Sequence, residues 1–249
     1  MRRKVAALAA LVLLATSAGC TSLFGPGQLS DDQLNEEATY DWDRNATVTI
    51  DIHTDNYTAV YRFENRSSRE LQVYGHDTLG LERPLDVHAL RYRYPNGTVI
   101  APEDSEAFSV SQGREQLTVS FPQANGSLAY TVPKNGKTVT TPAFVDGASY
   151  EVIVPPKTDV AVPLLGKVRP GGYTAEEVDG RVHVRWDEVT ANTISVRYYL
   201  DRDLLIFGGL TGVLTVAGVI GAAYYLLQIK ELERRREEVG LDVDGDEGP

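Results

Sequence analysis

The sequence contains one cysteine, Cys20, whose thiol directly follows the small residues 17–19. A thiol at this position can be alkylated by a lipid and become the N-terminus of a processed chain. The preceding residues suit export, because residues 2–4 are cationic and the apolar run 5–15 is too short to cross a bilayer. We therefore interpret residues 1–19 as a signal peptide and Cys20 as a lipidation site. An uncleaved signal or a free thiol is the alternative.

Two groups of acidic residues have spacings that occur in metal sites. Asp51, His53 and Asp55 alternate along a predicted strand, so they would share one face and could hold a hard cation or zinc. An outer strand of an acidic protein also carries such residues, and we favour that interpretation. Residues 242–246 have an aspartate at every second position, as a calcium loop begins, but the required glycine and closing glutamate are missing. We therefore predict no metal site.

Signatures of catalysis are missing from the sequence. It contains no Gly-X-Ser-X-Gly, no phosphate-binding glycine loop and no His-Glu-X-X-His, and its four histidines are scattered. Acidic residues outnumber basic ones by 35 to 24, and the resulting net charge of −11 would repel nucleic-acid phosphates. We predict no catalytic residue, no cofactor and no nucleic-acid partner.

Five Asn-X-Ser/Thr sequences could accept N-linked sugar, which is a modification of exported proteins. Each is weak evidence alone, but all five lie between the signal peptide and the apolar C-terminal segment, which favours an exposed domain. The glycosylation candidates are Asn45, Asn56, Asn65, Asn96 and Asn125.

Strands are the elements expected to position these residues. From about Thr39 onward, eleven segments such as ATVTIDIH alternate apolar and polar residues, usually between Asn-Gly, Asp-Gly or proline-containing turns. This pattern predicts a mainly β protein with an antiparallel β-sandwich-like domain over residues 39–201. Polar turns around residues 125–134 leave open a split into two stacked β modules.

The clearest hairpin signal is the Asp-Gly pair at residues 179–180. A two-residue turn there would pair Glu176 with His183. Directing the apolar residues of the last predicted strand toward the core then requires a register that pairs His183 with Arg197.

That register would gather basic residues on one outer face. Arg181, Arg185 and Arg197 would form a cationic strip able to contact anionic lipid headgroups. The alternative, which we favour, is a local charge ladder in which Glu176 offsets its neighbours.

Residues 204–229 carry no charge and, as a helix, are long enough to cross a bilayer. Four basic residues within 230–236 follow directly, which places the C-terminus in the cytoplasm and the body outside. We expect residues 230–249 to form a charged helical stub and an acidic disordered tail. Small residues four apart, such as Gly208 and Gly212, could let two such helices associate as a homodimer.

Residues 20–38 would form a lipid-anchored spacer. Gly-Pro-Gly at 25–27 interrupts the chain, and Ser30 with Gln33 has the spacing of a capping box before a short helix.

The layout of the whole chain resembles that of haloarchaeal surface lipoproteins of uncharacterised families. Its specific motif is the lipobox-like SAGC that ends at Cys20, in which Ser17 stands where bacterial versions usually have leucine. Excess acid and scarce lysine add to the likeness. The resemblance implies a membrane-tethered extracytoplasmic domain with an archaeal isoprenoid ether on Cys20, and it transfers no active-site residue.

We predict a non-enzymatic binding or structural module of the cell envelope, held at the cell membrane by both ends. Its partners would be membrane lipid and an unidentified membrane or envelope protein. One alternative is an accessory subunit of a transporter or signalling complex. Another is a hydrolase or metal-dependent surface enzyme whose site is assembled from distant loops.

Overall fold

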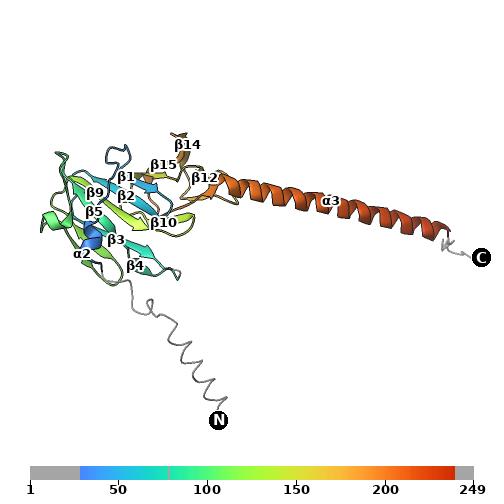
Figure 1. Cartoon of the computed structure of the whole chain (residues 1–249), viewed down its shortest axis with the longest axis horizontal. Coiled ribbons are helices and arrows are strands. Elements are labelled where there is room, and N and C mark those ends of the chain that lie inside the picture. The colour runs from blue at the N-terminus through green and yellow to red at the C-terminus, as the bar shows by residue number, and fades with distance from the viewer. Residues whose placement is uncertain (1–28, 78, 239–249) are drawn as a thin grey trace, which may run out of the picture. The chain divides into compact units, whose positions relative to one another are not determined.

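The computed structural model describes residues 29–77 and 79–238, and the chain divides into two compact units, residues 1–198 and 199–249. The first unit is built from strands and the second is dominated by one long helix (Figure 1). The predicted fold class is therefore confirmed: mainly β, with several antiparallel sheets and a long apolar C-terminal helix.

An eight-stranded sheet is the largest element of the body. Neighbouring strands are antiparallel, except for the parallel central pair β1–β11. The strand order is β14 (Thr174–Val178), β15 (Arg181–Val189), β11 (Ala148–Ile153), β1 (Val48–Ile52), β2 (Asn56–Phe63), β9 (Gly126–Pro133), β5 (His88–Arg93) and β6 (Val99–Ile100). Because β11, which follows residues 125–134, pairs with β1, which precedes them, the residues on both sides build one sheet and do not form separate modules.

Two smaller sheets pack against the inner face of the large sheet. One has the order β4 (Glu82–Pro84), β3 (Glu70–His76), β8 (Leu117–Ser120) and β7 (Ser109–Gln112). The other has the order β10 (Thr138–Pro142), β16 (Thr193–Arg197) and β13 (Lys167–Arg169). The remaining elements are α2 (Asp31–Asn35), η1 (Pro102–Asp104), β12 (Thr158–Asp159), β17 (Tyr199–Leu200) and α3 (Asp201–Glu238).

One apolar core lies between these layers and contains side chains from all of the strands that face it. Phe63 of the large sheet stacks on Phe121, which follows β8, with 4.9 Å between the ring centroids. The hydroxyl groups of Tyr61 and Tyr130 bond each other at 2.9 Å, which satisfies two polar groups inside the core. Period-two alternation explains this core, since every second residue of each strand points to the same face.

The outer face of the large sheet is partly covered by the N-terminal segment. Tyr40 packs against Val60 and Ala129, and its hydroxyl donates to the carbonyl of Ala89 at 2.5 Å. The short helix α2 precedes this segment, and the Ser30 hydroxyl accepts a hydrogen bond from the amide of Gln33 at 3.2 Å. This is one half of the predicted capping box, since the Gln33 side chain donates to Asp86 instead.

The predicted hairpin is present, with Glu176 opposite His183 between β14 and β15. The predicted pairing of His183 with Arg197 is wrong, because β15 pairs with β11 and places His183 opposite Ile153. Arg197 lies in a different sheet, opposite Thr138 and Lys167. Alternation identifies which face of a strand is buried but not which strand lies beside it, so a correct face was combined with a wrong neighbour.

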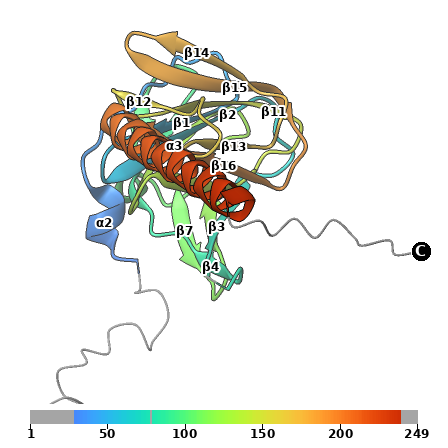
Figure 2. The ribbon, with the colours of Figure 1, turned by 90° about the vertical axis from the view of Figure 1, so that its right-hand side faces the viewer.

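The second unit consists largely of α3, a continuous helix (Figure 2). Residues 201–236 are long and apolar enough to cross a membrane. Their most apolar stretch has a mean hydropathy of 2.1, and none of it is buried inside the protein. The helix contains the predicted span 204–229 and continues through the basic stub. There the Glu231 and Arg235 side chains form an ion pair at 3.3 Å, one helical turn apart.

Candidate binding surface

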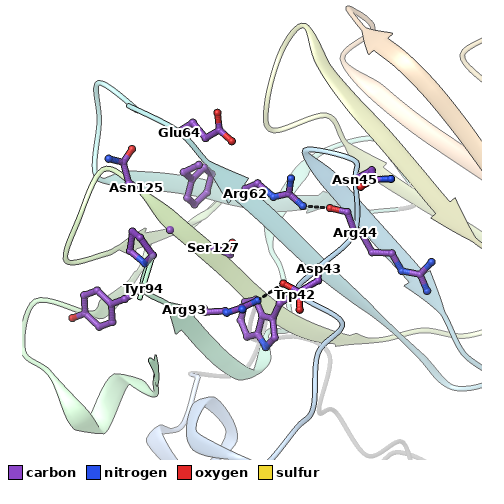
Figure 3. Close-up of a pocket in the computed structure, with 13 residues that line it drawn as sticks. Trp42, Asp43, Arg44, Asn45, Arg62, Glu64, Arg93, Tyr94, Asn125 and Ser127 are labelled. Carbon is purple, nitrogen blue, oxygen red and sulfur yellow. Dashed lines mark hydrogen bonds and ion pairs between the residues drawn. The ribbon is translucent and has the colours of Figure 1, made fainter. Parts of the chain in front are cut away.

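A hollow of about 500 Å³ opens at one end of the body and is the best candidate for a ligand site (Figure 3). It lies where four stretches meet: the segment before β1, the end of β2, the end of β5 and the start of β9. The side chains that shape it are Trp42, Asp43, Arg44, Asn45, Arg62, Glu64, Arg93, Tyr94, Asn125 and Ser127. Three guanidinium groups therefore gather at one place in an acidic protein.

The three arginines have different partners. Arg93 pairs with the carboxylate of Asp43 at 2.8 Å, and Arg44 pairs with Asp41 at 2.7 Å. Arg62 donates to the main-chain carbonyl of Arg44 and has no carboxylate partner among the described residues. Arg62 is thus the one of the three that has no carboxylate in contact, and a guanidinium with free N–H groups can bind an anion in a bidentate manner.

Glycine is required at the floor of this hollow. Gly126 has a φ of +148°, and a Cβ atom there would lie 2.3 Å from the Tyr92 hydroxyl oxygen and 2.7 Å from the Arg93 carbonyl oxygen. No side chain fits so close to these atoms. The tyrosine hydroxyl in turn donates to the carbonyl of Asn125 at 2.6 Å and fixes the turn that carries the hollow's edge.

A second hollow of about 420 Å³ lies on the other side of residues 43–45, which form the wall between the two. Its other lining comes from β11 and β15, including Glu151, Arg185 and Asp187. The two hollows share Asp43, Arg44 and Asn45, so movement of this one segment would alter both.

A buried ion cluster lies beneath the second hollow. The Glu151 carboxylate is only 3% exposed and contacts His183 Nδ1 and Arg185 Nε, both at 2.8 Å. Burial acts to raise the pKa of Glu151, but the hydrogen bonds and positive charges of His183 and Arg185 outweigh it, so the pKa lies below its ordinary value. Arg185 also reaches Glu176 at 3.4 Å.

The predicted cationic strip does not form. Arg181 is bound to the Asp51 carboxylate through two guanidinium nitrogens, at 2.5 and 3.1 Å, and Arg185 is bound to Glu151. Arg197 is exposed, but it belongs to a different sheet. The first two arginines therefore neutralise carboxylates on other strands of the same sheet. This is close to the charge ladder that the sequence also suggested, although the main partners are on β11, next to β15, and on β1, one strand further away.

The predicted Asp51–His53–Asp55 face is only partly formed. Strand β1 ends at Ile52, so Asp55 lies in the following turn, and His53 Nε2 is 3.8 Å from an Asp51 carboxylate oxygen that already binds Arg181. Among residues 29–77 and 79–238, no group of three or more histidine, cysteine, aspartate or glutamate side chains is close enough to hold a metal ion. Cys20 and the acidic tail residues 242–246 lie outside the described residues.

Four of the five glycosylation candidates surround the first hollow. Asn45 and Asn125 line it, and the amide nitrogen of Asn65 donates to the Asn125 side chain at 2.5 Å. Asn96 directly follows the lining residue Pro95. The other candidate, Asn56, lies at the opposite end of β2. These four asparagines are exposed in the folded body, as a modification site requires.

No local pattern in the sequence indicates the hollow directly. Trp42 and Arg44 precede the first strand, while Arg62 and Arg93 lie at the ends of β2 and β5, which are separated by the 24 residues 64–87. Only the sheet order β2–β9–β5 brings the two strand ends close together. The one available signal was indirect: three of the asparagine sequences that surround the hollow lie beside these residues.

Comparison with known proteins gives a family but no activity. A family model described as "Family of unknown function (DUF5803)" matches residues 44–244. No curated protein matches the chain. A solved structure of a candidate protease from Parabacteroides distasonis has 12% sequence identity and a TM-score of 0.32, covering 61% of this chain and 39% of that structure's chain. A likeness this weak carries no conclusion about fold or activity.

Proposed function

Because the chain belongs to the DUF5803 family, whose function is unknown, we propose from its own geometry that it is a membrane-anchored, extracytoplasmic binding module of the cell envelope. The observation that carries this proposal is the exposed apolar helix α3, whose most apolar stretch has no contact inside the protein that would bury it. Apolar side chains along such a length are stable in hydrocarbon but not in water. The helix would hold the β body at the membrane surface, outside the cell.

Both ends of the chain would contribute to anchoring. A lipid on Cys20 gives only reversible membrane binding by itself, whereas a spanning helix is effectively permanent. The basic residues after the span support a cytoplasmic C-terminus. The resemblance to haloarchaeal surface lipoproteins supports the same arrangement.

The first hollow would be the binding site, and its ligand would be an anionic group of an envelope polymer. Arg62 supplies the guanidinium for this anion, and Trp42 supplies an apolar surface beside it. Asn45, Asn125 and Ser127 add neutral hydrogen-bonding groups, which suit a hydroxyl-rich ligand such as an acidic polysaccharide.

The topology can be tested with the lysines that the chain already has. The body contains Lys134, Lys137, Lys157 and Lys167, whereas Lys230 follows the span. An amine reagent that cannot cross membranes should label the body lysines in intact cells and reach Lys230 only after lysis. Labelling of Lys230 in intact cells, or release of the full chain by alkaline extraction, would overturn the proposed anchorage.

Titration calorimetry of the full chain in detergent with an oligosaccharide of glucuronic acid would test binding. Arg62→Gln should weaken binding at least about tenfold, since a charged hydrogen-bond pair contributes about 1.5–3 kcal/mol. Arg114→Gln is the matched control, because Arg114 is exposed and lies outside both hollows. Equal affinity of wild type and Arg62→Gln, or no binding to the wild type, would reject this ligand class.

A further inference from the structure

The hairpin between β3 and β4 exposes two leucines at its tip. Leu79 is 82% exposed and Leu81 is 62% exposed, although turn positions usually carry small polar residues. The hairpin projects from the body, away from the large sheet (Figure 2). Water contact at both side chains is unfavourable, so these residues need a separate explanation.

Hydrogen bonds within the turn define the conformation of the tip. Asp77 Oδ1 accepts hydrogen bonds from the amides of Leu79 and Leu81, both at 2.9 Å. The amide of Gly80, which has a φ of +81°, donates to the Asp77 carbonyl at 3.0 Å. These bonds hold the two leucines outward, so their exposure does not result from fraying.

The nearest cation to the tip is compensated, whereas Glu82, which directly follows Leu81, is an exposed carboxylate. Arg83 pairs with the other Asp77 carboxylate oxygen at 2.9 Å, and the Asp77 side chain is 8% exposed. An apolar tip whose nearest cation is neutralised is suited to the boundary between lipid headgroups and acyl chains, where partial burial of leucine is favourable.

Two connections would keep the body close to a membrane. The amide of Leu29 donates to Gln112 Oε1 at 2.9 Å, and Gln112 is on β7, in the same four-stranded sheet as β3 and β4. Only residues 21–28 separate Leu29 from Cys20, so even a fully extended chain would span at most about 30 Å. A lipid at Cys20 would therefore hold this sheet near the bilayer.

The second connection is the helix itself. Strand β16 ends at Arg197 and α3 begins at Asp201, so no long linker separates the body from the span. A side chain on a tethered body meets the bilayer at a high effective concentration, which makes even a small apolar contact significant.

We propose that Leu79 and Leu81 insert into the outer leaflet of the membrane that anchors the chain, giving the body a third attachment besides the span and the Cys20 lipid. This proposal rests on the proposed anchorage. The partner that the tip contacts is lipid. The contact would restrict the orientation of the body on the membrane surface.

The test uses the full chain in liposomes, with Leu79→Cys labelled by the environment-sensitive fluorophore NBD. Leu164→Cys is the matched control, since Leu164 is also highly exposed, at 73%, but lies in another loop. Wild type treated with the same reagent reports any label on Cys20. The emission of label 79 should shift to the blue and be quenched by doxyl-labelled lipid, while label 164 should be quenched by iodide in the water.

Equal iodide quenching of the two labels would overturn the proposal. A blue shift at residue 79 without quenching by doxyl lipid would also overturn it, because it would indicate contact with a second copy of the protein. Alkaline extraction of the same liposomes separates the two proposals. A chain that resists extraction while its tip stays in water refutes only the tip contact, whereas an extracted chain refutes the anchorage.

Discussion

The β body buries most of its apolar side chains, whereas the helix α3 exposes them. In the body, most of the large aromatic residues are buried, and Tyr61 and Tyr130 are 1% and 0% exposed. In α3, Tyr224 and Tyr225 are 62% and 66% exposed, and the leucines beside them are similarly uncovered. The same residue types therefore stabilise the body by contacts within the protein, whereas in the helix they have no such contacts.

This difference means that the apolar side chains of the two regions are stabilised by different surroundings. The body folds by removing apolar surface from water, and neighbouring side chains provide the new environment. The helix satisfies its backbone hydrogen bonds internally, but its side chains need an environment that only lipid or another helix supplies. A substitution should therefore affect either folding or membrane integration, according to the region in which it lies.

The largest expected difference comes from one substitution made in both regions. Tyr130→Ala removes a buried ring and leaves the Tyr61 hydroxyl without its partner, so we expect the free energy of unfolding to fall by about 3–5 kcal/mol. Tyr224→Ala should leave it unchanged within about 0.5 kcal/mol. Denaturant titration of the full chain in detergent, followed by tryptophan fluorescence, measures both. Equal losses for the two variants would refute the distinction between the regions.

A charge placed in the helix should affect membrane insertion and leave the stability of the body unchanged. Leu214→Asp places a carboxylate near the middle of the span, which costs about 2.5–3.5 kcal/mol of insertion free energy. We expect a larger fraction of the chain to be extracted by alkali, with no change in the unfolding of the body. Leu164→Asp, in an exposed loop of the body, is the control and should change neither quantity. If Leu214→Asp remained fully membrane-bound and instead destabilised the body, α3 would not be the anchor.

Much of the fold could be predicted from the sequence because its signals are local. Alternation of apolar residues indicated the strands, Asp179 with Gly180 indicated a hairpin, and Ser30 with Gln33 indicated a short helix. The parallel pairing of β1 with β11 could not be predicted, because it joins segments about a hundred residues apart through contacts that leave no local pattern.

The candidate site was much less accessible to sequence reasoning. Arg62 and Arg93 come together only after β9 has entered the sheet between their strands, so their proximity depends on topology. The error at His183 has the same origin: its face was inferred correctly from the alternation of Val184 and Trp186, but its neighbour is β11 and not β16. Local patterns thus identify buried faces, while sites made at strand ends require the strand order.

The smallest of the expected effects compares one ion pair from each region. Glu151→Gln removes the negative charge between buried His183 and the guanidinium of Arg185, and we expect it to lower the free energy of unfolding by about 1.5–3 kcal/mol at neutral pH. Glu231→Gln removes an exposed partner of Arg235 within one helical turn, and its cost should be only about 0.2–0.5 kcal/mol.

The two variants should also differ in their pH dependence. Because the pKa of Glu151 is lowered in the folded protein, its contribution is fully present above the ordinary value of 4.5 and is lost as the pH falls through the lower folded pKa. The stability difference between wild type and Glu151→Gln should therefore shrink in acid, where the carboxyl group is protonated in both the folded and unfolded states. Denaturant titrations at several pH values between neutral and strongly acidic would measure it. A difference that stayed constant across this range would mean that Glu151 acts through packing alone, and the buried ion cluster would then not be what distinguishes this face of the body from the helix surface.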